Sequence, residues 1–427
     1  MGAALMRSRL VFFFCCSGLV FAQQPATRAE QVQEQRAATF KSPLPPDTDK
    51  IEEAIKWAND RGLLSVFSLG WKGFTPTIGG LMNGSGFSSG VQFSPAGLRE
   101  RNFVLRSSAR FSTRLYQLYD FEAGLPRLFN DTAYFDFYAR HRDSPQVPYY
   151  GPGPNSQKTG RSNYRLEDTS FDVSAGVKPM RRVRLGVNGG YLLTNVGPGT
   201  TKRYISTDKQ YTPSQTPGID VQSNFLRGGL LAHVDLRDSP YGPRAGGQYY
   251  ARFDYYDDRD RGLFSFRRLT AEAQQFVPLF NKKRVIVARA RTILSYPGSN
   301  QVPFYLQPSL GAADDLRGFR PYRFQDNNSF IMNAEWRWEI LSGVDGALFV
   351  DAGKVFPRPG DLNFKRLEKS YGGGLRFRAP STGALVMRID VAASREGVQL
   401  WFVFNDVFAA PHVRTGRELS PPPGRLP

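Results

Sequence analysis

The sequence contains very little cysteine and histidine, which leaves few ways to build a metal or thiol site. Its only cysteines are Cys15 and Cys16, both inside the first apolar segment. If that segment is cleaved as a secretory signal, the mature chain holds no disulfide, thiol nucleophile or cysteine-ligated metal. The histidines His141, His233 and His412 are not spaced as metal ligands. We therefore expect neither a metal site nor a cofactor.

The chain also lacks an apolar run long enough to cross a membrane as a helix. The run 10–22 has about 13 residues, whereas a spanning helix needs about 20. It follows Arg7 and Arg9 and ends at the small residue Ala22, which is the pattern of a secretory signal, so we expect 1–22 to be cleaved. A lipoprotein anchored on one of the cysteines is the alternative, but phenylalanines precede Cys15, where lipidation sites have small residues.

Negative charge is in the minority. The 38 Asp and Glu residues are outnumbered by 56 Lys and Arg residues, which gives a formal net charge of +18. Such an excess can attract nucleic acid or an anionic solute. The basic residues are scattered rather than clustered, so a polar lumen and basic loops near anionic lipid explain the excess more simply. We expect no nucleic-acid partner.

Over residues 73–408 the apolar residues recur with a period of two. In 334–340, Ala-Glu-Trp-Arg-Trp-Glu-Ile, one face is apolar and aromatic and the other is charged. Such a long array behind a signal sequence predicts an all-β, antiparallel transmembrane β-barrel rather than a soluble sandwich. Arginine at the bilayer midplane on the lipid face costs about 2–4 kcal/mol, so we expect Arg337 to point inward, together with Glu335 and Glu339.

The array divides into about sixteen strands. Their approximate starts are residues 73, 85, 102, 115, 130, 165, 180, 223, 246, 264, 283, 328, 345, 369, 383 and 397. The long linkers each follow an odd-numbered strand, at 143–164, 195–222, 297–327 and 357–368. Short turns on one side and long loops on the other are typical of an outer-membrane barrel. We therefore expect the exported chain to lie in the outer membrane of a Gram-negative type of cell.

The first strand, 74–80, is expected to be weak. Pro76 has no N–H for a ladder, and Gly79 and Gly80 have no side chain to pack. Such a strand belongs at an edge, and in a barrel that edge is the seam with the last strand.

The chain flanking the barrel is expected to be simple. Residues 23–72 predict a periplasmic leader that carries one short amphipathic helix over 49–61, capped by Asp49. Its apolar residues lie on one face, at Ile51, Ala54, Ile55 and Ala58. The proline-rich segment 409–427 predicts a disordered tail.

One hydrolase-like motif is present. Residues 86–90, Gly-Phe-Ser-Ser-Gly, match the G-x-S-x-G pattern of esterases, which requires Ser88 on a turn between a strand and a helix. Here 91–93 continues as strand, so we interpret the motif as small residues in a barrel wall. We expect no catalytic residue, and an esterase stays an alternative.

The most informative cluster is centred on the tripeptide Arg317-Gly318-Phe319, in the long linker before the twelfth strand. Glu335 faces inward on that strand, and Asp351 can face inward on the next. A linker folded back into the lumen could set Arg317 between the two carboxylates, because a guanidinium binds carboxylates with a planar fork of N–H groups. Gly318 then lets the backbone approach the wall, and Phe319 packs beside it. Taken alone, Arg317 is more simply interpreted as a solvated loop residue.

Three motifs in order resemble the BamA/TamA family of outer-membrane assembly and translocation proteins, also called bacterial surface antigens. They are Arg-Gly-Phe at 317–319, Phe-x-Asp-x-Gly at 349–353 and Gly-Gly-Gly-Leu-Arg-Phe at 372–377. The resemblance covers roughly 74–408 and is strongest over 310–408. It implies a lumenal loop six, held by the two carboxylates and by the motif that ends in Gly353.

The last strand also fits this family. Over 398–408, Phe402, Phe404 and Phe408 are expected to share one face, like the family's C-terminal insertion signal. Family members usually carry periplasmic POTRA domains before the barrel, whereas about fifty residues separate Ala22 from the first strand here. The resemblance therefore implies a short form without these domains.

The implied role is non-enzymatic insertion or translocation of proteins, or of lipids, at the outer membrane. A weak seam would open or template an incoming strand by β-augmentation. The implied partners are outer-membrane lipid and unfolded outer-membrane or secreted proteins. A passive porin for anionic solutes is the alternative, with Arg184, Arg252 and Arg289 expected to face the lumen.

Overall fold

The computed structural model describes most of the chain after residue 72. The described residues are 73–79, 81–82, 84–95, 97–98, 102–239, 242–280, 282–378, 385–404 and 408. All of them belong to the second of two compact units, Ser65–Pro427. The expected signal segment, the helix 49–61, Gly80 and the tail 409–427 lie outside this set. Within it, no helix has the length and apolar character to span a bilayer.

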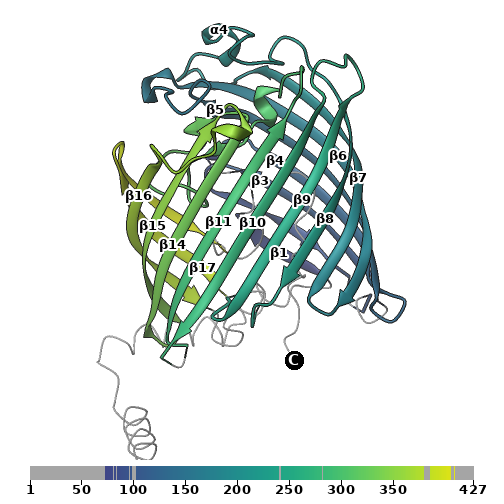
Figure 1. Ribbon diagram of the computed structural model, residues 1–427, viewed down its shortest axis with the longest axis vertical. Helices are drawn as coiled ribbons and strands as arrows, with labels where there is room; N and C mark the ends of the chain where they lie inside the picture. Colours follow the sequence, from purple (N-terminus) through teal and green to yellow (C-terminus); the bar gives the residue numbers. More distant parts are fainter. Residues whose placement is uncertain are drawn as a thin grey trace, which may run out of the picture. The chain divides into compact units, whose positions relative to one another are not determined.

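Sixteen antiparallel strands form one sheet in chain order, as predicted, and the sheet curls into a barrel (Figure 1). The wall strands are β1 (Phe74–Ile78), β2 (Ser88–Phe93), β3 (Val104–Ser112), β4 (Gln117–Leu128), β5 (Ala133–Tyr149), β6 (Ser162–Met180), β7 (Val183–Pro198), β8 (Phe225–Asp235), β9 (Gly246–Asp258), β10 (Phe266–Leu279), β11 (Arg284–Tyr296), β14 (Asn328–Leu341), β15 (Val344–Phe356), β16 (Glu368–Arg378), β17 (Leu385–Ser394) and β18 (Gly397–Val403).

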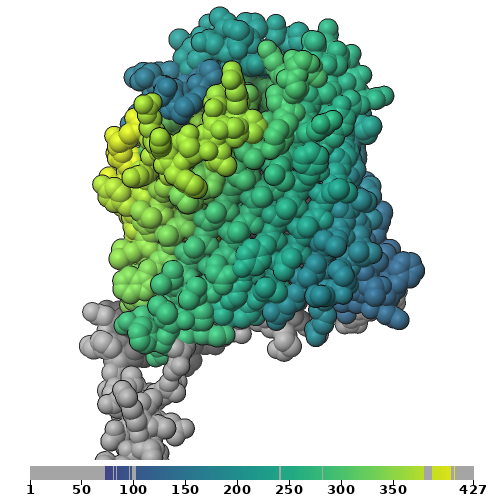
Figure 2. Space-filling model, in the orientation of Figure 1, coloured from purple at the N-terminus to yellow at the C-terminus, as the bar shows by residue number. Residues whose placement is uncertain are grey.

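The remaining elements lie in the long loops, and the loop residues visible in Figure 2 form a cap at one end of the barrel. These elements are η1 (Lys158–Gly160), α4 (Thr207–Gln210), η2 (Phe304–Leu306), β12 (Ser309–Leu310), β13 (Phe324–Gln325) and η3 (Pro359–Asp361). The wall strands seen in Figure 2 form a continuous surface below these loops.

The two faces of the wall differ as the alternation predicts. On β14, Glu335 and Arg337 are buried in the lumen, whereas Trp336 is exposed on the outer face. Glu339 is exposed near the end of the strand, beside an irregularity in the register, and lies 3.8 Å from Arg378. Along the middle of β14, apolar and aromatic side chains therefore lie outside and charged groups lie inside, and the exposed charge of Glu339 is found only near the strand end.

The seam is the weakest part of the wall. β1 has five residues and β18 has seven, whereas β5 and β6 have 17 and 19. Over the described residues, each ladder joins neighbours in the order β1 to β18, and none joins β18 back to β1. A Cβ on Gly79, just after β1, would lie 3.9 Å from Phe404, so the two edges approach each other without pairing.

The last strand is shorter than expected. It ends at Val403, so the prediction of one strand face shared by three phenylalanines is wrong for Phe408. Phe408 is completely buried against Phe276 of β10 and Val287 of β11, which face inward. Its ring therefore lies in apolar surroundings inside the lumen and not on the outer face with Phe402 and Phe404.

Candidate functional site

Loop six, defined here as residues 297–327, folds back into the barrel. Its β12 and β13 pair with each other, and left-handed backbone at Gly311 and Ala312 turns the chain between them. The amide of Ala312 donates to the carbonyl of Phe319 at 3.1 Å, which closes a tight loop with Arg317 near its tip. Four loop residues pack on two wall residues in one apolar cluster, made of Leu310, Leu316, Phe319, Phe324, Ile331 and Val355.

Arg317 is completely buried at the centre of the site. Its Nη1 lies 2.7 Å from Oε2 of Glu335, and its Nη2 lies 2.7 Å from Oδ1 of Asp351. Its Nε donates to both oxygens of Asp351, and its backbone amide donates to Oδ2 at 3.1 Å. The tip of loop six is therefore fixed by both the side chain and the backbone, in the fork geometry that suits carboxylates.

An aromatic ring completes the pocket around the guanidinium. Its Cζ lies 3.4 Å from the ring centroid of Phe349, which faces inward from β15 two residues before Asp351. A cation over an aromatic face is attracted by the ring quadrupole, more strongly when water is excluded. Phe349 belongs to the Phe-x-Asp-x-Gly motif, but sequence reasoning assigned it no contact.

Small residues allow the close approach of loop and wall. A Cβ on Gly318 would lie 2.6 Å from the side chain of Ser370 and 2.7 Å from the carbonyl of Ala393. A Cβ on Gly353 would lie 2.8 Å from the carbonyl of Phe330. Phe319 is buried, with its ring centroid 5.2 Å from that of Phe324. Any larger residue at Gly318 would push loop six away from the wall.

The wall supplies a network of charges that sequence reasoning missed. Glu335 accepts from Arg376 at 2.8 Å and from Arg337 at 2.7 Å, in addition to Arg317. Arg376 and Arg388 both pair with Asp390 of β17. These residues occupy inward positions on neighbouring strands, so alternation predicts their orientation, whereas their pairing depends on the register between strands.

Loop six also holds the terminal hairpin. The indole of Trp401 on β18 donates to the carbonyl of Arg317 at 2.7 Å, and the hydroxyl of Ser394 donates to the carbonyl of Gly318 at 2.7 Å. Further out, the guanidinium of Arg323 lies 2.8 Å from Glu396, in the turn between β17 and β18. β18 pairs with β17 on one edge and with no described strand on the other. Loop six therefore holds the terminal hairpin from inside the barrel.

The other predicted residues have simpler placements. Phe402 and Phe404 are exposed, and Pro76 lies within the short edge strand β1. Ser88 begins β2, and the chain continues as strand through Phe93, so the strand-to-helix turn that an esterase requires is not formed.

Of the arginines expected inside for a porin, two are buried and already bound by protein groups. Arg252 pairs with Asp254 at 2.7 Å, and Arg289 donates to Oδ1 of Asn333 at 2.9 Å. Arg184 is half-buried, 5.9 Å from the ring of Tyr134. A lumen that holds the anchored loop six, and in which Arg252 and Arg289 are already bound by protein groups, does not favour a passive pore.

The Omp85 superfamily domain matches residues 84–399. Among solved structures, BamA from Haemophilus ducreyi lacking POTRA domains 1–3 aligns with a TM-score of 0.58 at 16% identity, over 78% of this chain and 70% of that one. CdiB from Escherichia coli aligns with a TM-score of 0.50 at 14% identity, over 78% of this chain and 62% of that one. The chain thus spans less than two thirds of CdiB. No curated protein matches the sequence.

Proposed function

The chain belongs to the Omp85 superfamily, whose outer-membrane barrels are non-enzymatic transporters and insertases, and on this premise we propose that it inserts or translocates unfolded polypeptides at the outer membrane. Segment 1–22 acts as the export signal, and the substrates are outer-membrane or secreted proteins. Lipid transfer is the related alternative. Both roles need a wall that can open.

The unpaired seam is the observation that carries this proposal. β1 and β18 are the two ends of the described sheet, and each leaves a row of backbone N–H and C=O groups without a ladder partner. Such an edge is a template on which an extended segment can add as a new strand. Hydrogen bonds along the backbone do not depend on side chains, so many different substrates could be accepted.

Loop six controls how far this seam can open. β18 is hydrogen-bonded to the wall only through β17, and its inward Trp401 is held by the backbone of Arg317. Arg388 of β17 also donates to the carbonyl of Ala313 at 2.8 Å. Moving the terminal hairpin outward therefore requires these contacts with loop six to break.

A reversible crosslink across the seam tests the proposal. In the double variant Gly79→Cys, Phe404→Cys, the two Cβ atoms would be 3.9 Å apart, within the range of a disulfide. Gly79 has a positive φ of 77°, so its substitution costs about 1–3 kcal/mol, but the oxidised and reduced forms share this cost. The matched control, Ala273→Cys, Ala290→Cys, joins directly opposite residues of β10 and β11, which are already hydrogen-bonded.

The assay is the folding of an unfolded eight-stranded outer-membrane barrel into vesicles that contain the protein. We expect the oxidised seam variant to lose its acceleration of folding and dithiothreitol to restore it, while the control pair stays active in both states. Equal activity of the oxidised and reduced seam variants would contradict the proposal. Steady ion conductance without any effect on folding would favour the porin.

A further inference from the structure

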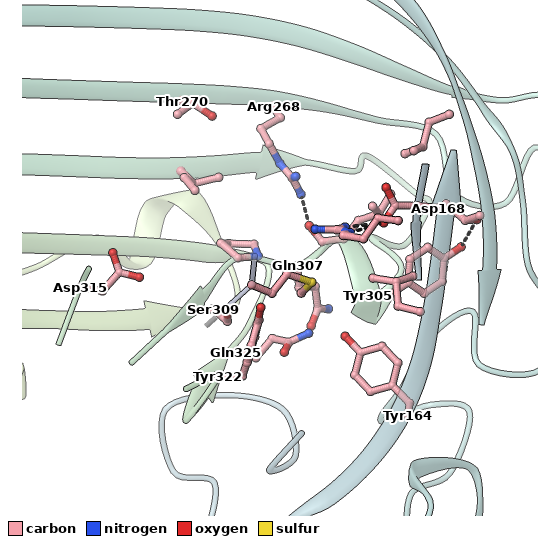
Figure 3. Close-up of a pocket in the computed structure, with 18 of the residues that line it drawn as sticks. Tyr164, Asp168, Arg268, Thr270, Tyr305, Gln307, Ser309, Asp315, Tyr322 and Gln325 are labelled. Carbon is pink, nitrogen blue, oxygen red and sulfur yellow. Dashed lines mark hydrogen bonds and ion pairs between the residues drawn. The ribbon is translucent and has the colours of Figure 1, made fainter. Parts of the chain in front are cut away.

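A cavity of about 190 Å³ lies in the lumen beside loop six, apart from the Arg317 anchor (Figure 3). Inward side chains of β5, β6, β7, β10 and β11 form its wall, and residues 305–309 of loop six form part of its lining. Neither Arg317 nor its carboxylate partners line it. The cavity is therefore a separate feature of the same lumen.

Arg268 of β10 is the unusual group in this cavity. Its side chain is buried, yet the described residues place no carboxylate within 4.0 Å of its guanidinium. Its Nε donates to the hydroxyl of Ser295 at 3.2 Å, and its Nη2 donates to the carbonyl of Leu306 at 2.8 Å. The ring centroids of Phe266 and Tyr256 lie 4.8 and 5.5 Å from its Cζ. All these partners are neutral.

The carboxylates that line the cavity form ion pairs with arginines other than Arg268. Asp168 is held by Arg140 and Arg142, Asp314 by Arg388, and Asp315 by Arg291. The lining contains four arginines and three aspartates, so one positive charge is left over. Figure 3 shows Arg268 reaching toward loop six, with Asp168 and Asp315 away from it on opposite sides.

The nearest carboxylate that acts on Arg268, Asp254, is itself paired with Arg252. A buried charge with no carboxylate in contact is costly, because the low-polarity surroundings replace the water that would solvate it. We propose that this cavity binds a small oxyanion, a phosphate or a carboxylate, on the guanidinium of Arg268. Its hydrogen bonds to Ser295, to Leu306 and to the hydroxyl of Tyr256 use three of its five N–H donors, which leaves donors for a ligand. An anion there supplies the missing charge and forms charge-assisted hydrogen bonds.

The rest of the lining suits such a ligand. Polar side chains reach the cavity from both the wall and loop six, namely Tyr164, Thr270, Gln307 and Ser309 (Figure 3). A water takes about 30 Å³ of liquid volume, so the space holds a small anion with a few waters but not a lipid with its acyl chains. An anion that bridges Arg268 and loop six would also hold this part of the loop in the lumen. This site does not depend on what the barrel transports.

Calorimetric titration of the refolded full chain in detergent with inorganic phosphate, and separately with acetate, tests the proposal. We expect saturable binding at one site, weakened about tenfold or more in Arg268→Gln through loss of hydrogen bonds to a charged group. Arg227→Gln is the matched control, because Arg227 is a buried lumenal arginine of β8 that pairs with Asp172 and does not line the cavity. It should bind within about twofold of the wild type, which is under 0.5 kcal/mol.

A second variant covers the case in which Arg268→Gln does not refold. Thr270→Met keeps every charge but fills part of the cavity, and it should also weaken binding, since methionine adapts to irregular space. Tighter binding of phosphate than of acetate assigns a phosphate ligand, and the reverse assigns a carboxylate. Absence of saturable binding by the wild type, or unchanged binding by either cavity variant, would overturn the proposal.

Discussion

At the scale of single residues, the anchor of loop six is the pairing of Arg317 with Asp351. Arg317 is the cationic partner of Asp351. The other side chains that donate hydrogen bonds to Asp351 are neutral, namely Asn333 at 2.7 Å and Ser370 at 2.9 Å. Glu335 is different, because Arg337 and Arg376 also bind it. Loss of Arg317 therefore leaves one uncompensated carboxylate rather than two.

This difference between Asp351 and Glu335 predicts that Arg317→Ala destabilises the attachment of loop six to the wall. Removing one partner of a buried ion pair costs about 3–5 kcal/mol, so loop six should loosen and become sensitive to added protease in intact barrels. Arg317→Lys should rescue it only in part, since an ammonium lacks the planar fork. Adding Asp351→Asn to Arg317→Ala should recover part of the loss by removing the uncompensated charge.

Arg320→Ala is the matched control, because Arg320 is a half-buried arginine of the same loop with no ion pair among the described residues. Its protease sensitivity should stay close to that of the wild type. If Arg320→Ala and Arg317→Ala loosen loop six equally, the anchor assignment is wrong.

A second prediction at this scale concerns Asp326, between β13 and β14 and outside the wall. Burial raises the pKa of its carboxyl from 3.8 to about 6, and the nearby Asp361 adds to the rise. The folded state then binds a proton that the unfolded chain has already released, so this group makes the free energy of unfolding fall as the pH rises from about 4 to 6. Above pH 6 the penalty of the buried charge is constant.

Asp326→Asn should remove this penalty. Thermal unfolding in detergent, measured from pH 4 to pH 7, should show the variant gaining stability relative to the wild type as the pH rises, with a constant difference above about pH 6. Because other carboxylates titrate in both proteins, the informative quantity is the difference between the two curves. Parallel curves would show that Asp326 titrates normally.

At the scale of the strand, β11 is a direct test of the alternation. Arg289 and Arg291 face inward and are buried, while Ala290 between them faces lipid near the middle of the strand. Placing an arginine one residue along the strand, on the lipid-facing side, should therefore lower the stability of the barrel strongly. Ala290→Arg is expected to lower the free energy of unfolding in lipid vesicles by about 2–4 kcal/mol.

The control at this position is Ala290→Leu, which adds bulk but no charge and should have little effect on a lipid-facing surface. Urea titrations in vesicles, followed by the heat-modifiable migration of the folded barrel, compare the two variants with the wild type. Equal stability of all three would place Ala290 away from lipid and would contradict the assigned faces.

At the scale of the whole molecule, the barrel should form without its leader. Each described strand finds its ladder partners within 74–403, so deleting 23–62 behind an intact signal segment should leave membrane insertion unchanged. We then expect the apolar stripe predicted on helix 49–61 to close the barrel end or to bind a docking partner. Fractionation and heat-modifiable migration measure insertion, and a deleted chain that fails to reach the outer membrane would refute this division of roles.

The sequence by itself determined the class and plan of the barrel. A period of two sorts side chains onto two faces, and the high cost of charge in lipid decides which face is outside, so residues such as Arg337 and Trp336 could be oriented without coordinates. Turn residues and linker lengths then placed sixteen strands close to their observed positions. The Arg-Gly-Phe motif pointed to Glu335 and Asp351 only with the help of a family resemblance.

The tertiary structure alone decided which inward groups meet. The pairing of Arg376 with Glu335, separated by 41 residues, depends on strand register and barrel curvature, which local alternation does not specify. The same holds for the ring of Phe349 beside Arg317 and for Phe408 inside the lumen rather than on the last strand. Alternation gives each side chain a direction, but its partner is set by closure of the sheet and by how loop six folds back into it.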